Sequence, residues 1–217
     1  AAAYVFTATI TAVNDAPANA GDTAAVNEDT AYTAWAAGTD WGYTDVDSDT
    51  MVSITLVTLP SHGTLTSTNS ACASATCIAG DVIVLARLAA GDLIYTGLLN
   101  YNGAEAFTYT IQDAALSSPV GQMTITVNAV NDVPNAGDTS DQTVYEDLAF
   151  SFQTTQSTDV DGDTLSMACV ETGFDMPAMM TETADSGGQA TLGGTATAAA
   201  LILAESDSDN TYGMTCT

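Results

Sequence analysis

Apolar and polar residues alternate strictly along several segments of this chain. In residues 4–13, Phe6, Ala8 and Ile10 alternate with threonines, and residues 120–130 repeat the pattern. A period of two places successive side chains on opposite faces of an extended backbone, and threonine and isoleucine favour that conformation. Both segments are therefore predicted to be β-strands with one buried face.

The same pattern extends through the middle of the chain, whereas helical periodicity is nearly absent. Further strands are predicted at residues 52–59, 81–88, 93–96 and 107–111, with a turn at residues 60–63. Residues 196–203 are one weak candidate for a short helix. The pattern as a whole predicts an all-β fold of the sandwich type.

A short motif follows each of the two alternating segments described first. AVNDAP stands at Ala12–Pro17 and AVNDVP at Ala129–Pro134, and the distance from Val13 to Val130 is 117 residues. That spacing fits one β-sandwich domain and is far too long for a solenoid repeat. The motif is therefore interpreted as a hinge that separates tandem domains.

The spacing of the hinges sets the expected domain boundaries. They are an orphan terminal strand with its linker at 1–16, a first domain at 17–133 and a second, incomplete domain at 134–217. The second domain stops one strand short, which exposes core side chains and unpaired backbone. We expect residues 4–13 of one copy, with Phe6, Ala8 and Ile10 facing inward, to complete the open sandwich of another copy. The alternative is a longer tandem array in which the same strand is covalently continuous.

The charge balance is extreme. Arg87 is the only basic residue, lysine is absent, and 27 acidic residues give a formal net charge of −26. Nucleic acid and anionic lipid are excluded as partners because the chain has almost nothing to neutralise phosphate. The hydrophobic fraction of 46% and the strong alternation indicate that the chain folds nonetheless. The counter-charge is therefore expected from outside, from divalent cations or a saline medium.

The cysteines favour an extracellular location. Four are present, an even number, and the expected disulfides are Cys72 with Cys77 and Cys169 with Cys216. No apolar run is long enough to span a bilayer, and the N-terminal residues lack the features of a signal peptide. The sequence is therefore expected to be a mature or excised part of a secreted protein, without membrane insertion.

Five motifs in a fixed order resemble a known family. NEDT, DVDSDT, PSHGTLT, YNGAEAFTYTIQDA and ITVNAVNDVP are similar to the cadherin-like tandem repeats of giant bacterial surface proteins and adhesins. The resemblance covers residues 14–133 well and residues 135–217 less well. It implies immunoglobulin-like sandwiches of about seven strands, with calcium bound where domains join end to end.

The acidic motifs supply the ligands that such junctions would need. Calcium takes about six to eight oxygen ligands, and no single motif here offers enough, so ligands must converge from loops at one pole of a sandwich. The expected inter-domain junction comprises Glu28, Glu105, Asn131, Asp132, Asp159, Asp161 and Asp163. The upper junction comprises Asn14, Asp15, Asp45, Asp47, Asp49 and Asp113. The lower junction comprises Glu146, Asp147, Asp207 and Asp209.

Two other kinds of site are disfavoured by the sequence. An EF-hand would need Gly at its sixth position and Glu at its twelfth, where this chain has Thr50 and Leu56 in the first repeat. His62 is the only histidine and is expected to be a turn residue before Gly63. The acidic pairs lie in exposed loops rather than in a cleft, so the chain is not expected to be an enzyme.

The sequence therefore predicts a structural function. We expect a calcium-stiffened extracellular rod of a bacterial surface filament or adhesin, whose partners are copies of itself or adjacent repeats. The alternative is an adhesive or carbohydrate-binding module of a large secreted protein, with a cell surface or glycan as partner. That alternative would need an exposed aromatic platform, for which Trp35, Trp41 and Tyr43 are the clustered candidates. These side chains are more readily interpreted as packing residues.

Overall fold

The computed structural model describes residues 3–35, 41–135, 148–165, 169–172, 180–185, 189–195 and 213–216. The chain divides into two compact units, Ala1–Val130 and Asn131–Thr217. The AVNDVP hinge therefore contains the boundary between the units. Within the described residues, no helix is long and apolar enough to cross a membrane.

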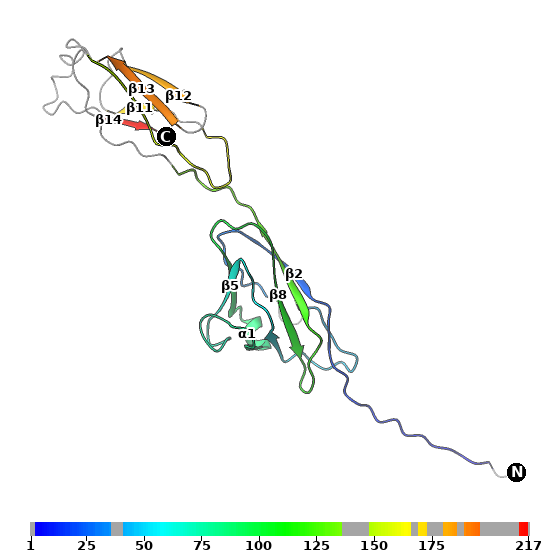
Figure 1. Ribbon diagram of the computed structural model, residues 1–217. Coiled ribbons are helices and arrows are strands. Elements are labelled where there is room, and N and C mark those ends of the chain that lie inside the picture. Colours follow the sequence, from blue (N-terminus) through cyan, green and yellow to red (C-terminus); the bar gives the residue numbers. More distant parts are fainter. Residues whose placement is uncertain are drawn as a thin grey trace. The chain divides into compact units, whose positions relative to one another are not determined.

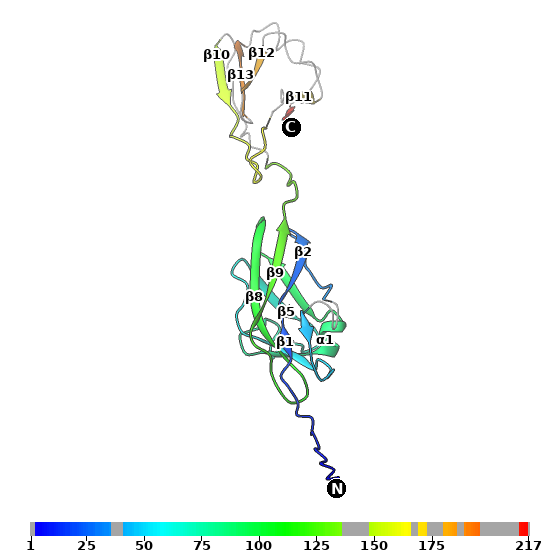
Figure 2. The same ribbon diagram turned by 90° about the vertical axis from the view of Figure 1, so that its right-hand side faces the viewer.

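The first unit is built around a five-stranded sheet with the order β2-β9-β8-β4-β6. Its strands are β2 (Asp22–Asn27), β4 (Ser53–Leu56), β6 (Val82–Val84), β8 (Gly103–Gln112) and β9 (Gly121–Asn128). β8 and β9 pair antiparallel, whereas β2 runs parallel to β9. Figure 2 shows β2, β9 and β8 side by side. β9 is thus an inner strand with a partner on each edge.

Two short ladders complete the sandwich. β5 (Gly63–Ser67) pairs with β7 (Leu93–Gly97), and β1 (Ala18–Asn19) pairs with β3 (Tyr43–Thr44). A bridge between Tyr32 and Tyr95 extends the β5-β7 ladder. In Figure 1, β5 lies on one side of the sandwich, and β2 and β8 lie on the other. The core fills the space between them.

The core follows the alternation of the sequence. Phe107, Tyr109 and Ile111 on β8 are fully buried, as are Met123 and Ile125 on β9. The intervening threonines are partly or fully exposed. The predicted strands at 107–111 and 120–130 are therefore confirmed. In each, alternate residues form the buried face, as the two-residue period of a strand requires.

Two elements differ from the sequence-based expectation. The segment 81–88 is a strand only at Val82–Val84 and then forms α1 (Leu85–Ala89), so the predicted strand there is too long. Leucine, alanine and arginine favour a helical turn, and this turn buries Leu88 alone. β2 was not anticipated because Val26 is its only large apolar residue; its register comes from parallel pairing with β9.

Residues 4–13 form no ladder within the described part of the chain. Phe6 and Ile10 are 90% and 94% exposed, and Tyr4, Val5 and Val13 are exposed as well. A strand needs a neighbour to satisfy its backbone groups and to cover its apolar face. The strand predicted at 4–13 is therefore absent from the single chain, although its alternating pattern remains.

The second unit is described in parts. Its strands are β10 (Ala149–Gln153), β11 (Cys169–Thr172), β12 (Met180–Asp185), β13 (Gln189–Thr195) and β14 (Gly213–Cys216). Two antiparallel sheets are present, with the orders β10-β13-β12 and β11-β14. The weak helix predicted at 196–203 lies outside the described residues. What is described is again β-structure, as the sequence predicts.

Candidate metal centres

An acidic loop follows β3 in the first unit and wraps around one carboxylate. Oδ1 of Asp45 accepts hydrogen bonds from the backbone N–H groups of Asp47 at 2.8 Å and Asp49 at 3.1 Å. Ser48 has a φ of 66°, the left-handed conformation that turns the chain back on itself. The side chain of the first aspartate, Asp45, therefore fixes the backbone of the loop that follows it.

The second unit contains the same loop. Oδ1 of Asp159 accepts hydrogen bonds from the backbone N–H groups of Asp161 at 2.9 Å and Asp163 at 3.2 Å. Gly162 takes the place of Ser48 with a φ of 76°, which glycine adopts without strain. The two repeats thus differ in sequence at this turn but share its hydrogen bonds.

Each hinge residue is tied to the acidic loop that follows it. The backbone N–H of Asp15 donates to Oδ2 of Asp47 at 2.7 Å, and that of Asp132 donates to Oδ2 of Asp161 at the same distance. In the first unit, Nδ2 of Asn14 also approaches Oδ2 of Asp113 at 3.4 Å. The structure thereby connects all six predicted residues of the upper set. In the second unit, Asp132 joins Asp159, Asp161 and Asp163, with Asn131 beside it.

One carboxylate oxygen in each loop lacks a hydrogen-bond donor. Oδ2 of Asp45 and Oδ2 of Asp159 are buried, and neither has a hydrogen-bond partner in the structure. A buried anionic oxygen without a donor is costly, and a hard cation satisfies it. Among the described residues, no three carboxylates approach within 4.8 Å of one another. Each loop thus offers a partial set of oxygen ligands, and its role in binding calcium stays a prediction.

Tyr43, which precedes the loop on β3, is not among the predicted ligands but contacts the loop. The hydroxyl of Tyr43 donates to the backbone oxygen of Asp49 at 2.6 Å. Burial, followed by the charges of Asp45, Asp113 and Asp49, raises the pKa of Tyr43. The phenol therefore stays protonated and fixes the end of the loop. Its position two residues before Asp45 is the one signal in the sequence.

The opposite pole of the first unit holds two buried glutamates. Oε1 of Glu28 accepts the backbone N–H of Val130 at 2.6 Å, and Oε2 lies 3.5 Å from Nδ2 of Asn102. The two glutamates, Glu28 and Glu105, lie near the end of β9. β8 begins there at Gly103, opposite Val127, and Glu105 lies opposite Ile125. Glu28 is thus bound to the segment that leaves the sandwich.

Glu105 anchors the turn at residues 60–63. It accepts the backbone N–H groups of His62 and of Ala106, the latter at 2.8 Å, and the Ser61 hydroxyl lies within 3.4 Å. Desolvation acts to raise the pKa of Glu105, but the hydrogen bonds from Ala106, His62 and Ser61 outweigh it and lower the pKa. The carboxylate is therefore ionised and already has protein donors. Its role as a calcium ligand stays a prediction.

His62 completes that cluster without the geometry of a catalytic triad. Its ring stacks on Tyr101 with centroids 4.4 Å apart. Nδ1 lies 3.0 Å from Oγ of Ser61 and 3.3 Å from Oε2 of Glu105. In a triad the serine and the carboxylate contact opposite ring nitrogens, whereas here both contact Nδ1. The arrangement fits a turn residue.

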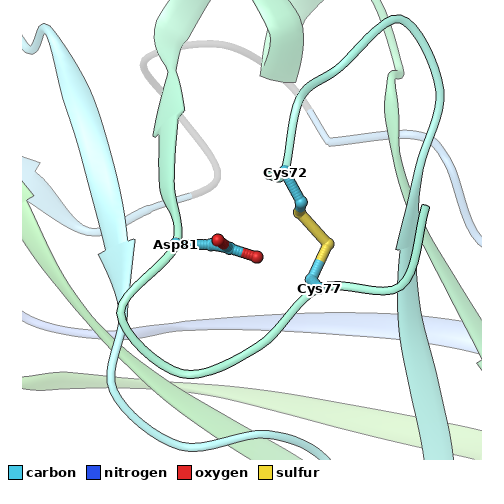
Figure 3. A group of neighbouring side chains, drawn as sticks. All are labelled: Cys72, Cys77 and Asp81. Atoms are coloured by element: carbon cyan, nitrogen blue, oxygen red, sulfur yellow. A yellow bond between two sulfur atoms is a disulfide. The ribbon is translucent and has the colours of Figure 1, made fainter. Parts of the chain in front are cut away.

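The cysteine predictions have different outcomes. Cys72 and Cys77 form a disulfide, as predicted (Figure 3). Asp81 lies beside it, and its Oδ2 accepts the backbone N–H of Ile78 at 2.8 Å. This trio is compact enough for a metal, but disulfide sulfurs are not thiolate ligands, so it is a structural cluster. Cys169 and Cys216 are directly opposite in the β11-β14 ladder; their disulfide stays a prediction.

Two further expectations concern other parts of the chain. The lower set, Glu146, Asp147, Asp207 and Asp209, lies outside the described residues. Trp35 and Trp41 are 3% and 0% exposed, with ring centroids 5.5 Å apart in the core. Nε1 of Trp35 donates to the backbone oxygen of Leu93 at 2.9 Å. They pack as predicted and do not form an exposed aromatic platform.

Several solved structures match the chain at low sequence identity and low TM-score. They include an endo-fucoidan hydrolase from glycoside hydrolase family 107 (18% identity, TM-score 0.33), the extracellular cadherin domains of protocadherin gamma B7 (15%, 0.35) and the titin domains z1z2 in complex with telethonin (9%, 0.30). The matches cover 85%, 84% and 86% of this chain, and 25%, 41% and 84% of those chains. The chain thus spans about a quarter of the hydrolase. No curated protein sequence matches it.

A family model gives the assignment. Residues 14–127, more than half of the chain, match the model described as Bacterial Ig domain. These residues are the ones that form the mostly β sandwich described above, so the resemblance to bacterial immunoglobulin-like repeats is confirmed. Domains of this kind are non-catalytic and usually belong to secreted or surface proteins. The chain belongs to the bacterial Ig domain family.

Proposed function

We propose that the protein is a structural repeat of an extracellular bacterial filament or adhesin, stiffened by calcium at its acidic loops. The observation that carries this proposal is the duplicated loop. Asp45 and Asp159 each hold two backbone N–H groups through Oδ1 and leave Oδ2 buried without a donor. The same hydrogen-bonded loop occurs twice, each time with a buried carboxylate oxygen that has no donor, which supports a cation as the common ligand.

The cation would act on the hinges. Asp15 and Asp132 donate their backbone N–H groups to the loop, so a cation bound by the loop carboxylates restrains the hinge residue as well. With a net charge of −26, the chain repels itself wherever carboxylates cluster. A divalent cation would remove that repulsion and add bonds between hinge and loop, which would stiffen the entry of the chain into each unit.

Units would join end to end through residues 4–13. This segment carries the alternating pattern of a core strand, yet its apolar side chains are exposed in the single chain. Completion of a neighbouring sandwich by this segment would bury them. The same segment in a longer covalent array would serve the same purpose. Mass spectrometry of the intact native protein distinguishes the two, because assembly by exchange requires a discrete subunit of this length.

Thermal unfolding with calcium and with excess chelator tests the calcium proposal. Calcium that binds only the folded state should raise the melting temperature, in proportion to the logarithm of its concentration above the Kd. Magnesium at equal ionic strength is the control, because it prefers a smaller octahedral site and keeps its waters. An identical melting temperature in calcium and in chelator would refute the assignment.

A further inference from the structure

We infer that Tyr43 is the positioning residue of the first acidic loop, because its hydroxyl holds Ser48 in the left-handed conformation that the loop requires. The inference rests on the proposed function and deepens it, since it names the residue that sets the calcium affinity of one loop and not of the other. The two acidic loops share one backbone geometry but reach it with different residues.

The turn within each loop requires a residue in the left-handed conformation. Ser48 has a φ of 66° in the first loop, and Gly162 has a φ of 76° in the second. Glycine adopts this conformation freely, whereas in serine the Cβ atom disfavours it by a factor of about ten. The first loop therefore needs a stabilising contact at this turn that the second loop can do without.

Tyr43 supplies that contact at the residue that follows the turn. Its hydroxyl donates to the backbone oxygen of Asp49 at 2.6 Å, and the backbone N–H of Asp49 donates to Oδ1 of Asp45 at 3.1 Å. Both backbone polar groups of Asp49 are thus fixed. A rotation of Ser48 to a negative φ would displace Asp49 and break both hydrogen bonds. The Tyr43 hydroxyl therefore stabilises the left-handed turn.

Tyr43 itself lies on a firmly held segment. It pairs with Asn19 in the β1-β3 ladder, and the backbone N–H of Ala20 donates to the backbone oxygen of Gly42 at 3.0 Å. A Cβ atom on Gly42 would overlap the backbone oxygen of Gly21, so the two segments are in close contact. The Tyr43 ring is partly buried against the core. The hydroxyl is therefore presented to the loop from a fixed position.

The second unit keeps the segment before the loop and changes the residue. Asn135 and Thr158 form a bridge through backbone hydrogen bonds of 2.7 and 3.0 Å, in the place of the β1-β3 ladder of the first unit. The residue before Thr158 is Ser157, where the first unit has Tyr43. The second loop thus combines serine at this position with glycine at its turn. The tyrosine occurs in the loop whose turn is strained.

The Tyr43 hydrogen bond acts on cation binding because it keeps the loop formed in the absence of the ion. Ser48 lies between Asp49 and Asp47, and the Asp47 carboxylate accepts the backbone N–H of Asp15 in the hinge. Where the turn is lost, a cation must restore it in order to bind. The apparent Kd then rises by the reciprocal of the fraction of chains in which the loop is formed. Removal of the hydroxyl should therefore weaken calcium at the first loop, and Ser48→Gly should cancel this effect.

A double-mutant cycle on the full chain tests this coupling. Calcium is titrated into Tyr43→Phe, Ser48→Gly and the double variant, and the Kd of each loop is read from its backbone amide signals in NMR spectra. Tyr43→Phe should weaken binding at the first loop about fivefold and leave the second loop unchanged. In the presence of Ser48→Gly, the same substitution should change the Kd by less than about twofold. A hydrogen bond that acted independently of the turn would change the Kd by the same factor in both backgrounds.

Two controls accompany the cycle. Tyr101→Phe removes a similar exposed hydrogen bond, from the hydroxyl to the backbone oxygen of Ala104 at 2.8 Å, and should leave the first loop unchanged. Gly162→Ser should weaken calcium at the second loop about tenfold, because serine takes the place of tyrosine before that loop. Melting temperatures in chelator show that each variant folds.

The outcomes separate the inference from the proposed function. Equal losses from Tyr43→Phe with and without Ser48→Gly, or no loss at all, would overturn the inference while the calcium proposal stands. Amide signals of both loops that do not respond to calcium would refute the calcium proposal, and the inference with it.

Discussion

Asp45→Asn separates the two roles of the acidic loop. The asparagine retains Oδ1, so it can still accept the backbone N–H groups of Asp47 and Asp49. It replaces Oδ2, the buried oxygen without a donor, by an amide that cannot bind a cation. The loop should therefore keep its shape and lose its charge and its ligand. The effect on stability should consequently change sign with calcium.

The magnitude follows from binding linkage. At calcium one hundred times above the Kd, binding stabilises the folded state by about 2.7 kcal/mol, and a site weakened roughly a hundredfold retains only about 0.4 kcal/mol. The variant should lose about 2 kcal/mol, or roughly 6–10 °C in melting temperature for a unit of this size. In chelator the removal of one carboxylate from a like-charged cluster should instead stabilise by about 0.5–1 kcal/mol.

Differential scanning calorimetry in calcium and in chelator is the assay. Asp22→Asn is the matched control, because it makes the same change of charge outside the predicted ligand sets, where Oδ1 of Asp22 accepts only the backbone N–H of Thr23. The control should behave alike in both conditions. A loss of stability in Asp45→Asn that is equal with and without calcium would show that the carboxylate is structural, and the cation assignment would fail.

Three further predictions concern the first unit. Glu105→Gln should cost about 2–3 kcal/mol in urea unfolding at neutral pH. Hydrogen bonds hold the folded pKa of Glu105 below the ordinary value for glutamate, so this stabilisation is present above that ordinary value and fades as the pH falls through the folded pKa. A difference that does not change with pH would contradict this prediction. Reduction of the Cys72–Cys77 disulfide should cost about 2 kcal/mol by loop entropy, measured against an alanine pair that should not respond to reductant. Tyr109→Phe removes a buried hydrogen bond and should cost about 1 kcal/mol in the same assay, whereas Tyr95→Phe removes a buried hydroxyl without a partner and should be neutral or stabilising.

Local patterns carried much of the fold. The alternation at 107–111 and 120–130 predicts which side chains are buried, because a strand has a fixed period of two and only one face can be covered. The repeated hinge and the repeated D-x-D-x-D spacing predict that Asp15 and Asp45 lie in one cluster, and hydrogen bonds through Asp47 connect them. Close cysteines such as Cys72 and Cys77 can be paired from sequence because few residues separate them.

Other features required the tertiary structure. The parallel pairing of β2 with β9 depends on residues about a hundred positions apart. β2 has one large apolar residue, so its sequence pattern does not indicate which strand it pairs with. Two of the donors to Glu105, Ser61 and His62, come from a turn that only folding brings near β8. The sequence predicts residues 4–13 to be an orphan strand, and the structure adds that Phe6 and Ile10 are almost fully exposed in the single chain. By itself the sequence determined the strictly alternating strands at 107–111 and 120–130, the repeat and the acidic loops, since these rest on local period and spacing. Long-range pairing decided which strands lie side by side and which carboxylate oxygens lack a donor.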